Sequence, residues 1–273
     1  MTAAHCGSIS ALTLGLPAST AIPEQKGTLP TAMFYAKTPV SARLKQRLVH
    51  DIDGITMLAI LRPENTGVEA TAKLGEILVM GIRHSSTQVP VEVLEHIARL
   101  RRSGIVFVCV HDVKASDPVG TYGARSASST PASSSPSSAS SAATAVTLSQ
   151  NGTELRGEIS ALAVRRTMPG KAGHPQQSAM LVGPWQPAAQ TRLVLAGATF
   201  EELWDSLCAQ AILDSSDGSN FDERLALREH IAELKAQEAK LAKDHARTKQ
   251  SAQRNEIYAK LHKVRAELSR LDG

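Results

Sequence analysis

The chain has 273 residues, of which 42% are hydrophobic, 21% are charged and only 3% are aromatic, and its formal net charge is +4. This length allows one or two globular domains with appended segments, and the core must be built mainly from aliphatic side chains. The positive balance is mild and falls short of the clustered excess that marks a dedicated nucleic-acid-binding domain.

The cysteines and the apolar segments indicate a cytoplasmic protein without membrane contact. Cys6, Cys109 and Cys208 are far apart and form no Cys-x-x-Cys pair, which excludes a zinc ribbon or a thioredoxin-like site. The chain begins without the basic segment of a signal peptide. The longest strongly apolar run, Ile105 to Val110, is far shorter than the ~20 residues of a membrane-spanning helix. We expect no bound metal and no cofactor.

Residues 1–115 are expected to form the first part of an α+β (or α/β) core. A helix is expected to begin near Thr38, whose hydroxyl can cap it. Further along, a strand over residues 76–83, a helix opened by Pro90 and a strand over residues 105–110 follow one another. This order predicts a βαβ unit, and the consecutive apolar residues IVFVCV predict a last strand that is buried on both faces.

The composition changes abruptly after this unit. Residues 126–145 consist of ten Ser, six Ala, two Thr and two Pro. Such a stretch cannot bury enough surface to offset the entropy lost on ordering, so we expect a disordered insert over residues 116–150. The core is expected to resume over residues 151–219 and to contain about four or five strands in all. A linker between two domains is the alternative interpretation of the insert.

Residues 220–273 are predicted to form an antiparallel coiled-coil hairpin of two helices, with Asn220 as the first cap. Apolar side chains at heptad spacing define one seam on each helix, and these candidate partner-binding residues are Ile231, Leu234, Leu241, Ile257, Leu261, Val264 and Leu268. Glu238 and His245 leave the seam polar at two positions. A single continuous helix is the alternative.

Catalytic signals are sparse. The sequence has no Gly-rich phosphate loop, no Gly-x-Ser-x-Gly elbow and no His-Glu-x-x-His motif. Asp112 and Lys114 follow the apolar strand, and strand ends are where open α/β sheets bind ligands. A metal-dependent nuclease would need a second acidic residue beside them, for which Glu76 is the candidate. Nothing in the spacing requires Glu76 to lie beside them.

The turn of the predicted hairpin is basic. The candidate nucleic-acid contacts are Lys243, Arg247, Lys249 and Arg254. Such a cluster can meet a phosphate backbone, although a charged helix surface more often faces only solvent.

The order and spacing of several segments indicate a family. These segments are MFYAKTPVSARLKQRLVHDIDGI, EILVMGIR, VEVLEHIARL, IVFVCV, Trp185 with Pro187, Leu195 to Gly197, REHIAELKAQEAKL and NEIYAKLHKVRAEL. Together they resemble the bacterial domain of unknown function number four-three-nine-one. The chain departs from the family pattern at Ser103 to Ile105, where the family tends to have a proline, and in the Ser/Ala-rich insert.

The resemblance implies a genomic setting rather than a mechanism. It implies encoding beside helicase-like and DNA methyltransferase-like proteins, in restriction or phage-defence neighbourhoods. The leading hypothesis is therefore a non-enzymatic accessory or adaptor protein whose hairpin contacts a protein partner, such as a helicase or methyltransferase, or a second copy of itself. The alternatives are a divergent metal-dependent nuclease subunit acting with a helicase, and a DNA-binding module that uses the basic hairpin tip.

Overall fold

The computed structural model describes residues 2–36, 38–114, 147–148, 154–155, 157–168, 177–248 and 250–271. They belong to two compact units, Met1–Ser219 and Asn220–Gly273, which we treat separately. The predicted insert, residues 116–150, lies outside the described residues, apart from Thr147 and Leu148.

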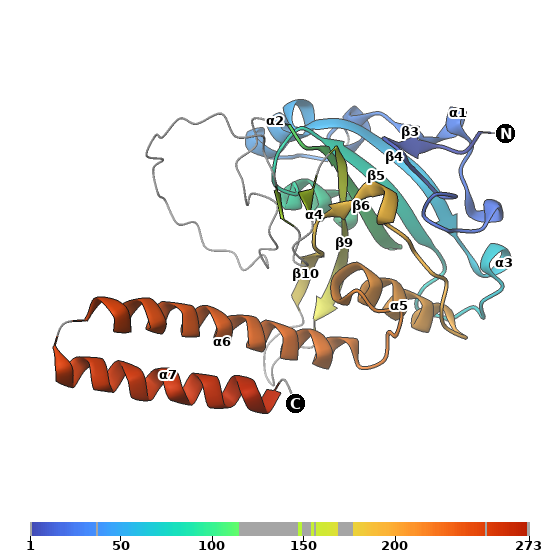
Figure 1. Ribbon diagram of the computed structural model, residues 1–273. Helices are drawn as coiled ribbons and strands as arrows, with labels where there is room; N and C mark the ends of the chain where they lie inside the picture. Colours follow the sequence, from blue (N-terminus) through green and yellow to red (C-terminus); the bar gives the residue numbers. More distant parts are fainter. Residues whose placement is uncertain are drawn as a thin grey trace. The chain divides into compact units, whose positions relative to one another are not determined.

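The elements in the described part of the chain follow one another in a mixed α and β order (Figure 1). They are β1 (His5–Cys6), β2 (Ile9–Ser10), η1 (Ala18–Thr20), α1 (Glu24–Gly27), β3 (Thr28–Leu29), η2 (Thr31–Phe34), α2 (Ala42–His50), β4 (Ile52–Leu61), α3 (Pro63–Thr66), β5 (Ile77–His84), α4 (Val91–Arg99), β6 (Gly104–Asp112), β7 (Thr147–Leu148), β8 (Glu154–Leu155), β9 (Glu158–Met168), β10 (Gln177–Val182), β11 (Gln186–Pro187), η3 (Ala188–Gln190), α5 (Phe200–Leu213), α6 (Phe221–Arg247) and α7 (Ser251–Leu271).

A seven-stranded mixed sheet organises the first unit. Within the described residues its strand order is β10-β9-β6-β5-β4-β3, and β11 also pairs with β9. Strands β5 and β6 are parallel, and the other pairs are antiparallel. The predicted βαβ unit and the α+β class are confirmed. The expectation of four or five strands was too low, because two-residue strands such as β3 and β11 leave no periodic pattern.

Several element ends differ from those expected. The helix predicted near Thr38 begins at Ala42, because the Ser41 hydroxyl accepts a hydrogen bond from the Leu44 amide and caps it there. Strand β6 continues beyond the apolar run to Asp112, since its pairing with β9 extends to Glu158.

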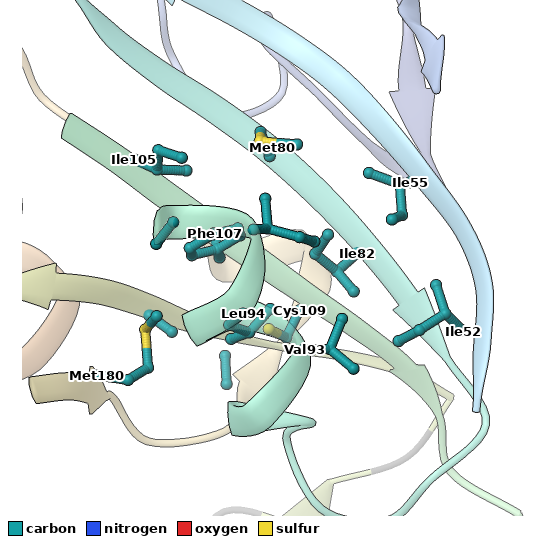
Figure 2. Close-up of a cluster of buried hydrophobic side chains, with 14 of the residues drawn as sticks. Ile52, Ile55, Met80, Ile82, Val93, Leu94, Ile105, Phe107, Cys109 and Met180 are labelled. Carbon is teal, nitrogen blue, oxygen red and sulfur yellow. The ribbon is translucent and has the colours of Figure 1, made fainter. Parts of the chain in front are cut away.

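The main hydrophobic core lies between the sheet and helix α4. Side chains from β5 and β6 such as Met80, Ile82 and Phe107 pack against Val93 and Leu94 of α4 (Figure 2). All five are at most 2% exposed. Successive side chains of a strand point to opposite faces, so the intervening residues face the other side of the sheet, where α5 contacts β6 and β9. The central strand is therefore buried on both faces, as its apolar run predicts.

The second unit is a pair of packed antiparallel helices (Figure 1). Helix α6 ends at Arg247 and α7 begins at Ser251, so the chain reverses within the polar stretch between them. Asn220 stands at the first cap position, but with φ of 49° its side chain makes no capping hydrogen bond, which corrects the predicted cap. The hairpin thus forms without the single continuous helix that was its alternative.

Candidate functional site

Two buried histidines stand at the carboxyl ends of the parallel strands. His84 ends β5 and His111 lies near the end of β6, and their rings stack with centroids 5.6 Å apart and an interplanar angle of 22°. The Trp185 ring contacts both imidazole rings at a tilt, with centroid distances of 5.8 Å to His84 and 6.3 Å to His111. Each histidine is 1% exposed.

The surroundings of His84 hold its imidazole in the neutral form. Its Nδ1–H donates to the Ser86 carbonyl at 2.9 Å, and its own backbone carbonyl accepts from His111 Nδ1 at 3.0 Å. Its Nε2 atom is buried without a hydrogen-bond partner. Burial, reinforced by His111, lowers the pKa of His84 to about 4. The stacked rings of His84 and His111 thus connect the ends of two central strands.

An ion-pair cluster occupies the opposite face at the same end of the sheet. Arg83 Nη2 lies 2.5 Å from Asp112 Oδ2, and Arg83 Nη1 lies 3.3 Å from Glu158 Oε1. The amide and hydroxyl of Ser8 donate to the other Glu158 oxygen, the amide at 2.7 Å. A side chain at Gly7, whose φ is +62°, would collide with the Glu158 carboxylate. The cluster links the connection between β1 and β2 to the sheet, and it pairs the Asp112 carboxylate with Arg83.

The structure does not bring together the residues of the nuclease hypothesis. Glu76 comes just before the start of β5, whereas Asp112 lies at the end of the parallel strand β6. The length of the eight-residue strand β5, about 26 Å, therefore separates the two carboxylates. Glu76 accepts a hydrogen bond from Ser103 at 2.8 Å, and this bond together with Arg62 keeps the pKa of its carboxyl below the usual value. Lys114 is exposed, two residues beyond Asp112. In the described part of the chain, no group of three or more His, Cys, Asp or Glu side chains could hold a metal ion.

The seam residues of the hairpin face one another inside it. Leu234, Val264 and Leu268 form a buried cluster, and Ile231, Leu241 and Leu271 pack against it. Leu261 is also buried, and Ile257 is half-buried. At the polar seam positions, Arg265 Nε lies 2.7 Å from Glu238 Oε1, and the rings of His245 and Tyr258 are 5.9 Å apart. The apolar stripe is therefore used within the unit.

The basic side chains at the hairpin tip face outwards. Lys243, Arg247 and Arg254 are exposed and form no ion pair within the described residues, and Lys249 lies outside them. Further from the tip, acidic side chains form ion pairs with basic ones, as in Glu238–Arg265 and Glu256–Lys260. Positive charge is therefore left uncompensated at the tip.

A cationic hollow of about 700 Å³ was missed by the sequence analysis. It lies where β6 begins and β9 ends, beside the first turns of α5, and its lining includes Arg101, Arg102, Arg165, Arg166 and Trp204. The signal was two Arg-Arg pairs, one before the strand predicted over residues 105–110, which is β6, and one near the end of β9. Antiparallel pairing of those strands brings the two pairs to one edge, but the pairing could not be predicted from the sequence.

The fold defines an α+β protein that carries a separate helical hairpin. The model of the family described as Domain of unknown function (DUF4391) matches residues 14–122 and 143–268, and the chain belongs to this family. No curated protein and no solved structure matches the chain. Among the described residues, no helix combines the length and apolar character needed to cross a membrane.

Proposed function

We propose that this protein is a non-enzymatic accessory protein that contacts nucleic acid through the basic tip of its hairpin. The observation that carries the proposal is the charge of the tip. Residues 240–254 contain five cations, Lys240, Lys243, Arg247, Lys249 and Arg254, and one acid, Asp244. The resulting balance of +4 over fifteen residues equals the formal net charge of the whole chain.

The hairpin presents these charges in a form suited to a phosphate backbone. Lys243 and Arg247 lie one turn apart on the last part of α6, and Arg254 lies on the first turn of α7. The buried seam holds the two helices together, so the cations are positioned as one group. Phosphate contacts of this kind supply affinity without base recognition and depend strongly on salt. Such contact suits the restriction or phage-defence setting implied by the family resemblance.

The test is duplex DNA binding by the double variant Lys243→Ala with Arg247→Ala. We expect affinity at low salt to fall about tenfold, and the slope of log affinity against log salt to become shallower by about two, one for each lost phosphate contact. Fluorescence anisotropy of a labelled duplex over a salt series measures both quantities. The matched control is Lys263→Ala with Arg270→Ala, which removes the same charge from exposed positions further along α7.

An unchanged slope in the tip variant, or an equal loss in the control, would rule the proposal out. The first result would mean that the tip does not meet phosphates. The second would mean that binding follows only the total charge of the unit.

A protein partner on the hairpin is the second candidate function. The seam residues are occupied within the unit, so a partner would contact outer apolar side chains, of which Leu227 is 43% and Tyr258 is 55% exposed. We expect Leu227→Ala with Tyr258→Ala to lose a self-association or a partner that the full chain retains. Sedimentation of the purified chain and tagged capture from cells measure the two. Unchanged assembly in this variant would remove the adaptor hypothesis.

A further inference from the structure

All residues that line the cationic hollow belong to the unit Met1–Ser219, so it shares no residue with the hairpin tip. Four segments meet around it: the connection between α3 and β5, the connection between α4 and β6, the last part of β9, and the first turns of α5. Its volume of about 700 Å³ lies within the range of small-molecule sites.

We propose that this hollow binds a nucleotide, with Arg101 and Arg102 holding its phosphates and Trp204 stacking on its base. The site goes beyond the proposed contact of the hairpin with duplex DNA, because it takes a single nucleotide unit. That unit is either free or part of a single strand, since both present the same base and phosphate.

The charge of the hollow favours an anionic ligand. Five cations and two carboxylates line it. Three of the cations are balanced by carboxylates in or beside the hollow, in the pairs Lys73–Glu201 at 3.6 Å, Arg165–Glu95 at 3.5 Å and Arg166–Asp205 at 2.6 Å. The side chains of the remaining two, Arg101 and Arg102, are exposed and form no hydrogen bond or ion pair among the described residues, and the only carboxylate on which Arg101 acts electrostatically there is that of Glu76. Two adjacent guanidinium groups are well suited to bind phosphate oxygens through paired hydrogen bonds.

The two arginines sit on a short connection between rigid elements. Helix α4 ends at Arg99 and β6 begins at Gly104, which leaves a connection of four residues. Ser103, the last of these, donates its hydroxyl to Glu76 at 2.8 Å and ties the connection to the start of β5. The backbone that carries Arg101 and Arg102 is therefore held in place, which reduces the entropy lost when a phosphate binds.

Trp204 supplies the aromatic surface. Its ring lies on the backbone of Gly104, where an added Cβ would be 2.9 Å from the ring atom Cε3. Only glycine allows this approach, and it places the indole against the strand while the ring still lines the hollow. Stacking of a base on an aromatic ring is favourable for every base, so the site is expected to select for a nucleotide without strong preference among bases.

The test is calorimetric titration of the full chain with ATP, AMP, inorganic pyrophosphate and a single-stranded thymidine oligonucleotide of about eight nucleotides. We expect the chain to bind ATP, and Arg101→Ala with Arg102→Ala to weaken that binding at least about tenfold. The matched control, Arg43→Ala with Lys45→Ala, removes two exposed cations from α2 and should bind ATP as the unaltered chain does. Tighter binding of ATP than of the oligonucleotide would identify a free nucleotide as the ligand, and the reverse would identify a single strand.

The base is tested separately with Trp204→Leu. We expect this variant to lose affinity for ATP and AMP while its affinity for pyrophosphate is retained, and retained pyrophosphate binding also shows that the variant is folded. If Trp204→Leu does not fold, Trp204→Phe replaces it, and the ring that remains should preserve most of the affinity for AMP.

Three results would overturn the proposal. They are no heat of binding for any ligand at millimolar concentration, equal loss in the α2 control, and pyrophosphate bound as tightly as ATP with no effect of Trp204→Leu. The last result would reduce the hollow to a plain anion site. None of them bears on duplex binding at the hairpin tip, which is measured with different variants.

Discussion

Between pH 7 and pH 4 the protein is expected to lose about 3 kcal/mol of folding stability through His84 alone. In the folded protein burial lowers the pKa of this imidazole from 6.5 to about 4. As the pH falls below 6.5, the unfolded chain binds a proton at His84 that the folded chain does not bind, so unfolding becomes more favourable. The contribution is complete above pH 6.5 and decreases until the pH reaches about 4. This difference in pKa between the unfolded and the folded chain corresponds to roughly 3 kcal/mol.

The variant His84→Asn isolates this contribution. An asparagine amide can still donate to the Ser86 carbonyl, but it does not titrate and has no counterpart to the unpartnered Nε2 atom. We expect the variant to be less stable than the unaltered chain at pH 7, because the ring stack is lost, and to lose about 3 kcal/mol less between pH 7 and pH 4. Urea denaturation at a series of pH values, followed by tryptophan fluorescence, measures the difference.

When the pH dependence of stability is compared between His84→Asn and the unaltered chain, the contributions of the other titrating groups cancel. The matched control is His50→Asn, which removes an exposed histidine from α2 and tests whether the effect is specific to the buried position. If His84→Asn and the unaltered chain lose the same stability over this range, then His84 is not the group held neutral by the fold.

The parts of the fold that the sequence predicts are those with a local pattern. The run from Ile105 to Val110 predicts a central strand, and the heptad spacing predicts the two packed helices. The strands β3 and β11 have two residues each and depend on pairing with longer strands, so no local pattern could predict them. Likewise, the sequence could not predict that the Asn220 side chain makes no capping hydrogen bond, because this depends on the left-handed backbone conformation that the folded chain imposes on Asn220.

The candidate sites were harder to predict, because each depends on the register of the sheet. The stack of His84 on His111 requires that two parallel strands end together, and residues 27 positions apart give no sign of this. Asp112 was correctly placed at a strand end, but its partner Arg83 comes from the neighbouring strand. Trp204 reaches the hollow only because α5 packs on Gly104, which no spacing in the sequence indicates.

Truncation of a seam leucine is expected to open the hairpin. Leu234 is 6% exposed and packs with Val264 and Leu268 of the facing helix. Replacement of such a buried leucine by alanine costs about 2–5 kcal/mol, through lost burial and the cavity that remains. A unit of 54 residues has little stability to spare, so we expect Leu234→Ala to expose the amides of α7 to rapid hydrogen exchange while those of β6 stay protected.

The matched control for this variant is Leu227→Ala, two helical turns away on the same helix. Leu227 is 43% exposed, so its truncation should change the stability of the hairpin by no more than about 0.5 kcal/mol. Equal exchange in the two variants would contradict the packing of α6 on α7. Because the basic tip is positioned by the seam, Leu234→Ala should weaken duplex binding as the hairpin opens, although it removes no charge. A partner held by the outer side chains Leu227 and Tyr258 would instead be lost in Leu227→Ala with Tyr258→Ala while α7 kept its protection.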